Sequence, residues 1–154
     1  MKSAPVRSGR MGRPPDRAGW VHFPHEADVG LDGYGPTVAS AFEQAALAMT
    51  AAVTDPRGVR DRESVTVRCA APALDLLLAD WLNALVYEMA TGHRLFGRFR
   101  VTVRNGDLEA TAWGEPVDPA RHRPAVEVKG ATYTALSVRR ESDGLWHARC
   151  VIDV

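Results

Sequence analysis

The stretch FRVTVRNGDLEATA, residues 99–112, decides the fold of this chain. Apolar and polar residues alternate on both sides of Asn105-Gly106, the dipeptide typical of a two-residue β-turn. Such a turn fixes the strand register. The predicted pairs are Arg104 with Asp107, Val103 with Leu108, Val101 with Ala110 and Phe99 with Ala112. Because alternate residues of a strand point to the same side, the apolar side chains of both strands share one face of an antiparallel hairpin.

Two amphipathic helices precede this hairpin. The first is expected over residues 38–53, with Thr37 as its N-cap and Asp55-Pro56 ending it. The second follows Pro72, carries apolar residues from 74 to 89 at spacings of three and four, and ends at a left-handed Gly92. Each helix has one apolar stripe, which predicts that one side of each helix lies on a sheet.

Further strands are expected around Trp20–Phe23, at Val29 and Leu31, at Val65–Val67, and over residues 132–139 and 145–154. The second of these is predicted to turn at residues 32–35, Asp-Gly-Tyr-Gly. Strands are clustered near the end of the chain rather than alternating strictly with helices. This order predicts an α+β fold of two layers, a mostly antiparallel sheet with two α-helices packed on one face.

Composition defines one domain and one tail. The chain has 154 residues, with 19 basic and 19 acidic side chains, so its formal net charge is zero. A dedicated nucleic-acid binder would have an excess of basic residues. Residues 1–19 are basic and rich in Pro and Gly, which predicts a disordered arm before a single domain at 20–154. Two distant cysteines favour reduced thiols and a cytoplasmic location. No apolar run approaches the roughly 20 residues of a membrane helix, so no membrane partner is expected.

Enzyme motifs are not found in the sequence. It contains no phosphate-binding glycine loop and no Gly-x-Ser-x-Gly, and His25-Glu26 lacks the second histidine of a helical zinc protease motif. The acidic residues are more informative. Asp28 begins a predicted strand, and Asp153 is followed only by Val154. If Asp28 lies beside the chain end, three carboxylates must either bind a hard cation, calcium or magnesium, or take up protons. The alternative is that Asp28 accepts hydrogen bonds in a turn and Asp153 is solvated.

Lys129 is the remaining candidate. In a strand, Glu127 and Lys129 project from the same face. Two interpretations stay open: an exposed pair that contributes little to stability, or a contact offered to a partner.

These residues resemble the archease family. The stretch His25-Glu26-Ala27-Asp28-Val29-Gly30 is similar to the family pattern His-Thr-Ala-Asp-Ile-Gly. The resemblance continues in order, with similar spacing, from Trp20 to the end of the chain. The other matching segments are residues 41–46, 77–78, 80–82, 114–115, 122, 127–129, 132–133 and 151–154.

The resemblance implies a small cytoplasmic protein that is not itself an enzyme. It implies a non-catalytic activator of an RtcB-type RNA ligase, which promotes guanylylation and turnover of that ligase in tRNA splicing or RNA repair and meets RNA only indirectly. It implies a metal site at Asp28, Asp153 and Val154 that takes calcium, with magnesium possible, and a partner contact at Lys129. Two alternatives remain: a chaperone or modulator of other RNA-processing enzymes such as methyltransferases, and a metal-dependent hydrolase.

Overall fold

The computed structural model describes residues 16–154 and contains two antiparallel sheets and a pair of long helices. Of the predicted arm over residues 1–19, residues 1–15 lie outside this range, and the first strand begins at Gly19. The elements in chain order are β1 (Gly19–His25), β2 (Asp28–Gly35), α1 (Val38–Val53), η2 (Pro56–Gly58), β3 (Glu63–Ala70), α2 (Leu74–Gly92), β4 (Arg94–Arg104), β5 (Asp107–Pro116), α3 (Pro119–His122), β6 (Gly130–Ala131), β7 (Ser137–Arg140) and β8 (Trp146–Asp153).

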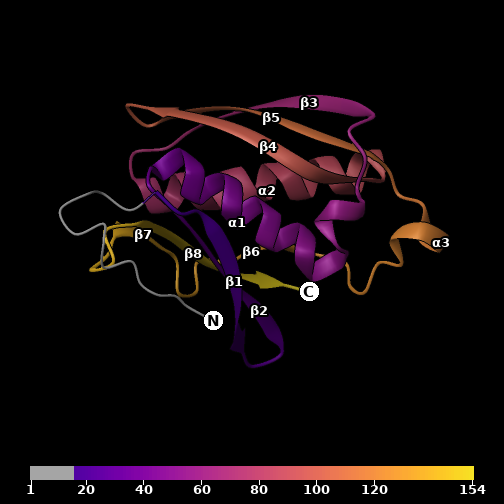
Figure 1. The fold of residues 1–154 in the computed structure, drawn as a ribbon, viewed down its shortest axis with the longest axis horizontal. Coiled ribbons are helices and arrows are strands. Elements are labelled where there is room, and N and C mark those ends of the chain that lie inside the picture. Colours follow the sequence, from indigo (N-terminus) through magenta and orange to yellow (C-terminus); the bar gives the residue numbers. More distant parts are fainter. Residues whose placement is uncertain (1–15) are drawn as a thin grey trace.

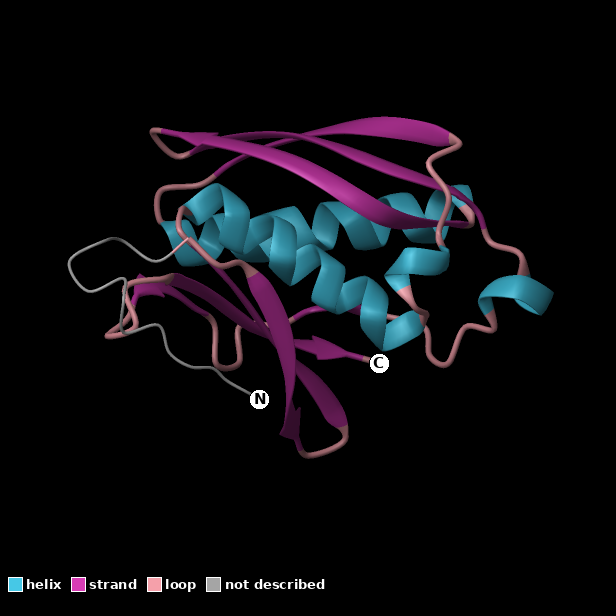
Figure 2. Ribbon diagram, in the orientation of Figure 1, coloured by secondary structure: helices cyan, strands magenta, loops and turns pink. Residues whose placement is uncertain are grey.

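The two sheets lie on opposite sides of α1 and α2 (Figure 1, Figure 2). One sheet has the strand order β1-β2-β8-β6, with β7 also pairing with β8, and the other has the order β3-β5-β4. The predicted α+β class and antiparallel pairing are confirmed. The arrangement differs from the prediction in one respect: the strands form two sheets, so the helices are enclosed between layers instead of lying on one face of a single sheet.

The β4–β5 hairpin has the register that the sequence predicts. Arg104 pairs with Asp107, and the pairing continues through Phe99 with Ala112. Asn105 and Gly106 have φ angles of 52° and 83°, the left-handed values that a type I′ turn requires. The register shifts between Phe96 and Arg98. This irregularity lies near the start of β4, outside the part of the hairpin that the sequence predicts.

Helix α1 is buried on more than one side. Thr37 caps it as predicted, because its hydroxyl accepts from the Ser40 N–H at 3.0 Å. The helix packs on β2 and β8 of one sheet and on β4 of the other. Small residues permit this double contact, since most of the fully buried positions of α1 are alanines. The pattern had predicted one apolar stripe because alanine gives a weak hydrophobic signal on the second side.

Strand β2 continues through the Asp-Gly-Tyr-Gly segment at residues 32–35, where the sequence had predicted a turn. The reason is the close approach of α1. A Cβ atom at Gly33 would collide with the backbone nitrogen of Ala45 and the backbone oxygen of Ala41. The glycine therefore serves helix packing rather than a change of chain direction.

Helix α2 supplies the largest buried side chain, Trp81. Its indole N–H donates to the Phe42 carbonyl of α1 at 3.0 Å, and its ring meets Phe99 of β4 edge-on at 6.0 Å. The helix ends one residue later than predicted, because His93, not Gly92, adopts the left-handed conformation, with φ of 50°. Helix α2 thus links α1 to the three-stranded sheet through one aromatic side chain.

Cys69 and Cys150 are both free thiols, as the sequence predicts. Among the helices of residues 16–154, none combines the length and the apolar character needed to cross a bilayer.

Candidate functional site

Three strand ends meet at one corner of the five-stranded sheet. Strand β8 lies between β2 and β6, and Val29 of β2 pairs with Ile152 of β8. Continuing this antiparallel register by one residue sets Asp28 opposite Asp153. Directly opposed residues of an antiparallel pair project from the same face, so these two carboxylates share the outer face of the sheet.

A tight β1–β2 hairpin presents Asp28 at this corner. His25 pairs with Asp28, so only Glu26 and Ala27 form the turn, and Glu26 takes a left-handed φ of 53°. Asp28 is half-buried and Asp153 is exposed. Within residues 16–154, neither carboxylate has a protein hydrogen bond or ion pair. The two side chains are therefore free to accept an external ligand.

Lys129 reaches the same corner from the other side of β8. Its backbone N–H donates to the Asp153 carbonyl at 2.7 Å, and the next residue, Gly130, pairs with Asp153. Asn83 of α2 fixes this short strand: its side-chain oxygen accepts from the Ala131 N–H at 2.9 Å. The Lys129 side chain is exposed, so its ammonium group faces solvent beside the end of β8.

Val154 follows Asp153 at the end of the chain, and its side chain packs against the hydrophobic core. This packing fixes the main-chain oxygens of Val154 next to Asp153. The structure thus brings together all four residues that the sequence singled out, Asp28, Asp153, Val154 and Lys129. We call this group the acidic corner.

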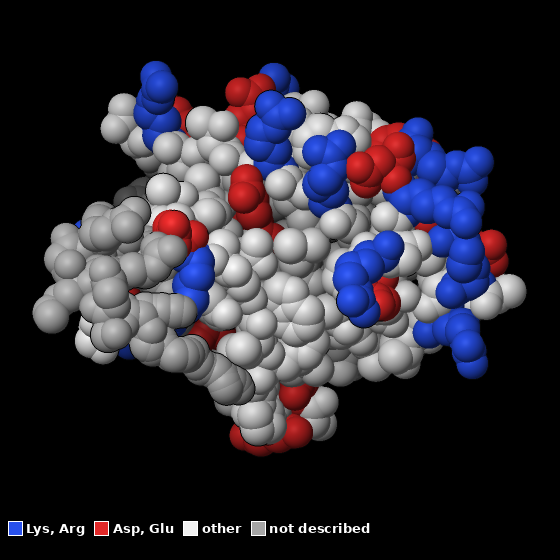
Figure 3. Space-filling view, viewed as in Figure 1, with Lys and Arg blue, Asp and Glu red and all other residues white. Residues whose placement is uncertain are grey.

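The donor set of the acidic corner fits a hard cation, because carboxylate and main-chain oxygens are the ligands that calcium and magnesium prefer. Residues 16–154 contain no group of three or more His, Cys, Asp and Glu side chains arranged to hold a metal ion. A metal here would therefore depend on the two aspartates together with Val154. His25, opposite Asp28, has a buried Nδ1 atom that makes no hydrogen bond to the described residues. Acidic atoms gather at the tip of the β1–β2 hairpin in Figure 3.

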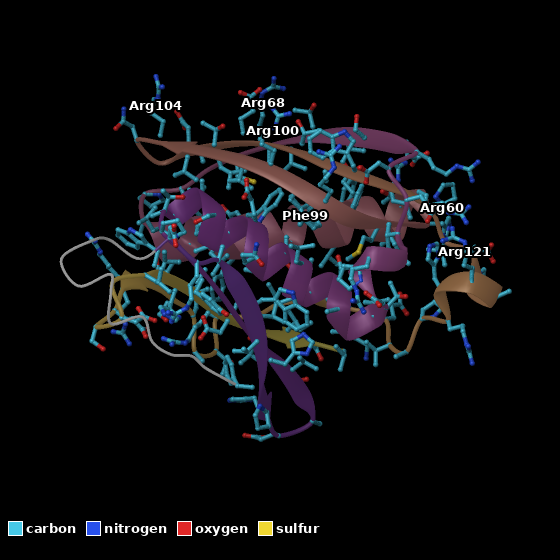
Figure 4. The ribbon with its side chains drawn as sticks, in the orientation of Figure 1. Arg60, Arg68, Phe99, Arg100, Arg104 and Arg121 are labelled. Carbon is cyan, nitrogen blue, oxygen red and sulfur yellow. The ribbon has the colours of Figure 1, made fainter. Side chains whose placement is uncertain are left out.

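A second polar cluster, around Glu115, was not predicted from the sequence. Glu115 lies near the end of β5 and is 1% exposed. Its carboxylate accepts from Arg121 Nη2 at 2.6 Å, the Arg60 backbone N–H at 2.8 Å and His122 Nε2 at 2.9 Å. Arg121 also donates to the Gly58 carbonyl at 2.7 Å. Figure 4 shows Arg60 and Arg121 at this end of the molecule, beside α3.

These contacts fix the protonation state of the cluster. The hydrogen bond from Arg121 lowers the pKa of Glu115 from 4.5 to about 2, helped by the Arg60 N–H and His122, although burial opposes the shift. The Asp118 backbone N–H donates to His122 Nδ1 at 2.9 Å, so the ring proton of His122 is on Nε2 and points to Glu115. In the sequence, Glu115 and His122 belong to two separate segments of the family resemblance. In the fold, a hydrogen bond joins their side chains in one network.

A third cluster lies farther along the outer face of the five-stranded sheet. The ring of His147 contacts Asp32 at 2.9 Å and Asp143 at 2.8 Å, and Arg149 pairs with Asp32 and Glu141. Burial opposes protonation of His147, but hydrogen bonds to Asp143 and Asp32 outweigh it and raise its pKa. The carboxylates of this cluster are thus paired with cationic groups, unlike those of the acidic corner.

Comparison with known proteins identifies the family. Residues 20–154 match the family model described as the Archease protein family (MTH1598/TM1083). "Protein archease" of Pyrococcus furiosus is 34% identical over 139 residues, covering 88% of this chain and 98% of that protein. "Protein archease" of Aeropyrum pernix is 36% identical over 141 residues, covering 88% of this chain and 97% of that protein.

A solved structure agrees with these sequence matches. The solution structure of Methanobacterium thermoautotrophicum protein 1598 superimposes with a TM-score of 0.73 at 30% identity, covering 88% of this chain and 99% of that chain. Both the sequence and the fold are therefore shared over nearly the full length of these relatives, and the chain belongs to the archease family.

Proposed function

We propose that this chain is a non-catalytic, cytoplasmic activator of an RtcB-type RNA ligase, which it helps to become guanylylated and to turn over in tRNA splicing or RNA repair. Family membership supports the class of function, and free thiols at Cys69 and Cys150 suit a reducing compartment. The site that would perform this role is the acidic corner. At the acidic corner, contact with RNA is made only through the ligase.

The observation that carries the proposal is the meeting of three strands at one point. Residues 28, 129 and 153 are far apart in the sequence, yet the register sets Asp28 opposite Asp153, and a 2.7 Å hydrogen bond joins Lys129 to Asp153. A protein that needed this corner only for stability would pair its charges. Here the carboxylates of Asp28 and Asp153 have no protein partner within residues 16–154.

We propose that Asp28, Asp153 and the main-chain oxygens of Val154 hold a calcium ion, with magnesium as the alternative hard cation. A bound cation would supply a fixed positive charge that ties the ends of β2 and β8 together. Asp28 and Asp153 would supply carboxylate oxygens from neighbouring strands. Val154 would act through main-chain oxygens whose position its core-packed side chain fixes.

Lys129 would then be the contact to the ligase. Its backbone is tied to Asp153, while its side chain is exposed, so binding of a cation would order the strand end that carries the ammonium group. An ammonium group on a flexible stem suits contact with phosphate oxygens. We propose that Lys129 enters the ligase active site and contacts the phosphates of the nucleotide during its transfer to the ligase.

The test is a guanylylation assay with the host ligase, GTP and this protein. Asp28→Asn, Asp153→Asn and Lys129→Ala should each reduce GMP attachment to the level of the ligase alone. Asp80→Asn is the matched control, because Asp80 is an exposed aspartate on α2 and is not one of the four residues of the acidic corner. This control should activate like the wild type, and circular dichroism should show that every variant is folded.

Full activation by Asp28→Asn and Asp153→Asn would contradict this proposal. A chaperone or modulator of other RNA-processing enzymes, such as methyltransferases, predicts that result, because it makes no use of the carboxylates at the corner. Phosphatase or nuclease turnover by the isolated chain that disappears in Asp28→Asn would contradict the non-catalytic role and favour a metal-dependent hydrolase.

A further inference from the structure

A cavity of about 620 Å³ lies between the C-terminal end of α1, η2 and α3. This volume is within the usual range of small-molecule sites, roughly 300–1,000 Å³. Arg57, Arg60, Arg121 and Arg123 line it, and Asp55 is the one carboxylate among its lining residues. Basic side chains gather on this flank in Figure 3, away from the acidic hairpin tip. The cavity is therefore a second candidate site, with charge opposite to that of the acidic corner.

Two of the four arginines are already neutralised by protein carboxylates. Arg57 pairs with Asp55 at 2.9 Å, and Arg121 pairs with Glu115 at 2.6 Å and also faces Asp118 at 3.9 Å. The guanidinium groups of Arg60 and Arg123 have no hydrogen bond or ion pair among the described residues. Two positive charges at the rim of one cavity are thus available to an anion.

The backbone fixes both of these arginines without using their side chains. The Arg60 N–H donates to the buried Glu115 carboxylate at 2.8 Å, and the Arg123 N–H donates to the Pro119 carbonyl at 3.0 Å. Arg123 also has a left-handed φ of 51°, a conformation that glycine adopts at lower cost. An arginine therefore occupies a position at which glycine is favoured, and it places a free guanidinium group beside the cavity.

We propose that this cavity binds the phosphate group of a nucleotide, either free or at the end of an RNA strand, with Arg60 and Arg123 as the donors. Guanidinium groups match phosphate oxygens with paired hydrogen bonds, so two free guanidinium groups favour phosphate over a smaller monovalent anion. The apolar last turn of α1, including Ala52 and Val53, supplies a wall against which the rest of the nucleotide can lie. This inference does not depend on the role of the acidic corner, and its test needs no ligase.

The test is a titration of the full chain with inorganic phosphate, with GTP and with a ten-nucleotide single-stranded RNA bearing a 3′-phosphate. NMR signals of the arginine Nε–H groups report binding. The double variant Arg60→Ala, Arg123→Gly should weaken binding at least about tenfold. It should also reduce the salt slope for the single-stranded RNA by about 1.4, because each lost phosphate contact contributes roughly 0.7. Glycine suits the left-handed position at 123, so this variant should fold, and melting temperatures check that it does.

The matched control is Arg139→Ala, Arg140→Ala on β7. It removes the same number of positive charges from the five-stranded sheet, whose residues do not line the cavity. It should leave the affinity for phosphate and GTP unchanged. An equal loss in this control would show diffuse attraction and would overturn the proposal, as would the absence of saturable binding of all three ligands to the wild type. Comparing GTP with the RNA identifies the source of the phosphate group. The true ligand should bind the wild type more tightly, and its affinity should fall more in the double variant.

Discussion

The acidic corner and the Glu115 cluster use carboxylates in opposite ways. Glu115 is buried and accepts hydrogen bonds from Arg121, Arg60 and His122, whereas the carboxylates of Asp28 and Asp153 have no protein partner within residues 16–154. A buried carboxylate must be fully satisfied by the protein, because an unpaired charge there is very costly. A carboxylate left unpaired at the end of a strand keeps its lone pairs for a ligand.

This difference separates stability from binding. Glu115 joins the end of β5 to the loop after η2 and to α3, so it contributes to the folded state and positions the basic cavity. The two aspartates of the acidic corner add repulsion between neighbouring strands, because like charges directly opposite each other are destabilising. Substitutions that remove one carboxylate at each place should therefore have different consequences.

The largest effect is expected from Glu115→Gln. The shift of the Glu115 pKa from 4.5 to about 2 corresponds to roughly 3 kcal/mol of folding free energy at neutral pH. Urea unfolding at pH 7 should show that the free energy of unfolding of the variant is lower than that of the wild type by about this amount. Glu109→Gln is the control: Glu109 pairs with Arg68 at 2.8 Å, but its side chain is 61% exposed, so the loss should stay below about 1 kcal/mol.

The same variant has a defined pH dependence. The folded pKa of Glu115 is depressed, so the stabilisation is present above about pH 4.5 and is lost as the pH falls toward 2. The difference in unfolding free energy between the wild type and Glu115→Gln should therefore shrink through this window. A difference that stays constant down to pH 2 would show that the charge of Glu115 is not the source of the stabilisation.

The next effect is expected at the acidic corner when calcium is added. A ligand that binds only the folded state stabilises it by about 2.7 kcal/mol at a concentration one hundred times its dissociation constant. Calcium should raise the melting temperature of the wild type and of Asp80→Asn but leave those of Asp28→Asn and Asp153→Asn unchanged. A rise in melting temperature with magnesium but not with calcium would identify magnesium as the bound cation. An unchanged melting temperature with both ions would contradict the proposed metal site.

A smaller effect is expected from adding residues after Val154. Compared with a chain that ends at Val154, an extended chain has a neutral peptide carbonyl in place of the Val154 carboxylate, so one negative charge is lost from the proposed donor set. The calcium-induced rise in melting temperature should shrink, while the melting temperature without metal should stay the same because the Val154 side chain still packs against the core. An undiminished calcium response would contradict the part assigned to the charge of Val154.

The sequence predicted the local geometry of the hairpin and the set of residues at the corner, and both predictions have a physical basis. Asn105-Gly106 fixes a register because left-handed turn residues leave few alternatives. Asp28 and Asp153 stood out because each is an acidic residue at the end of an apolar strand. That these residues bind a metal, and that Lys129 contacts a ligase, remain predictions.

The division into two sheets and the Glu115 cluster could not be predicted in the same way. The second packing side of α1 is built from alanines, and Gly33 has the appearance of a turn residue although it permits close contact with α1. Glu115, His122 and Arg60 come together only when the chain after β5 folds back over η2. Such a network has no spacing or period for a sequence argument to detect.

The smallest effect is expected from Asp28→Asn measured without metal, in the presence of a chelator. Removing one of two opposed like charges should change the unfolding free energy by less than about 0.5 kcal/mol, with a slight gain expected because cross-strand repulsion is relieved. Urea unfolding at low ionic strength measures this, and added salt should abolish the gain by screening. A loss of more than about 1 kcal/mol would mean that Asp28 stabilises the fold as Glu115 does, and the contrast between the two carboxylates would then be wrong.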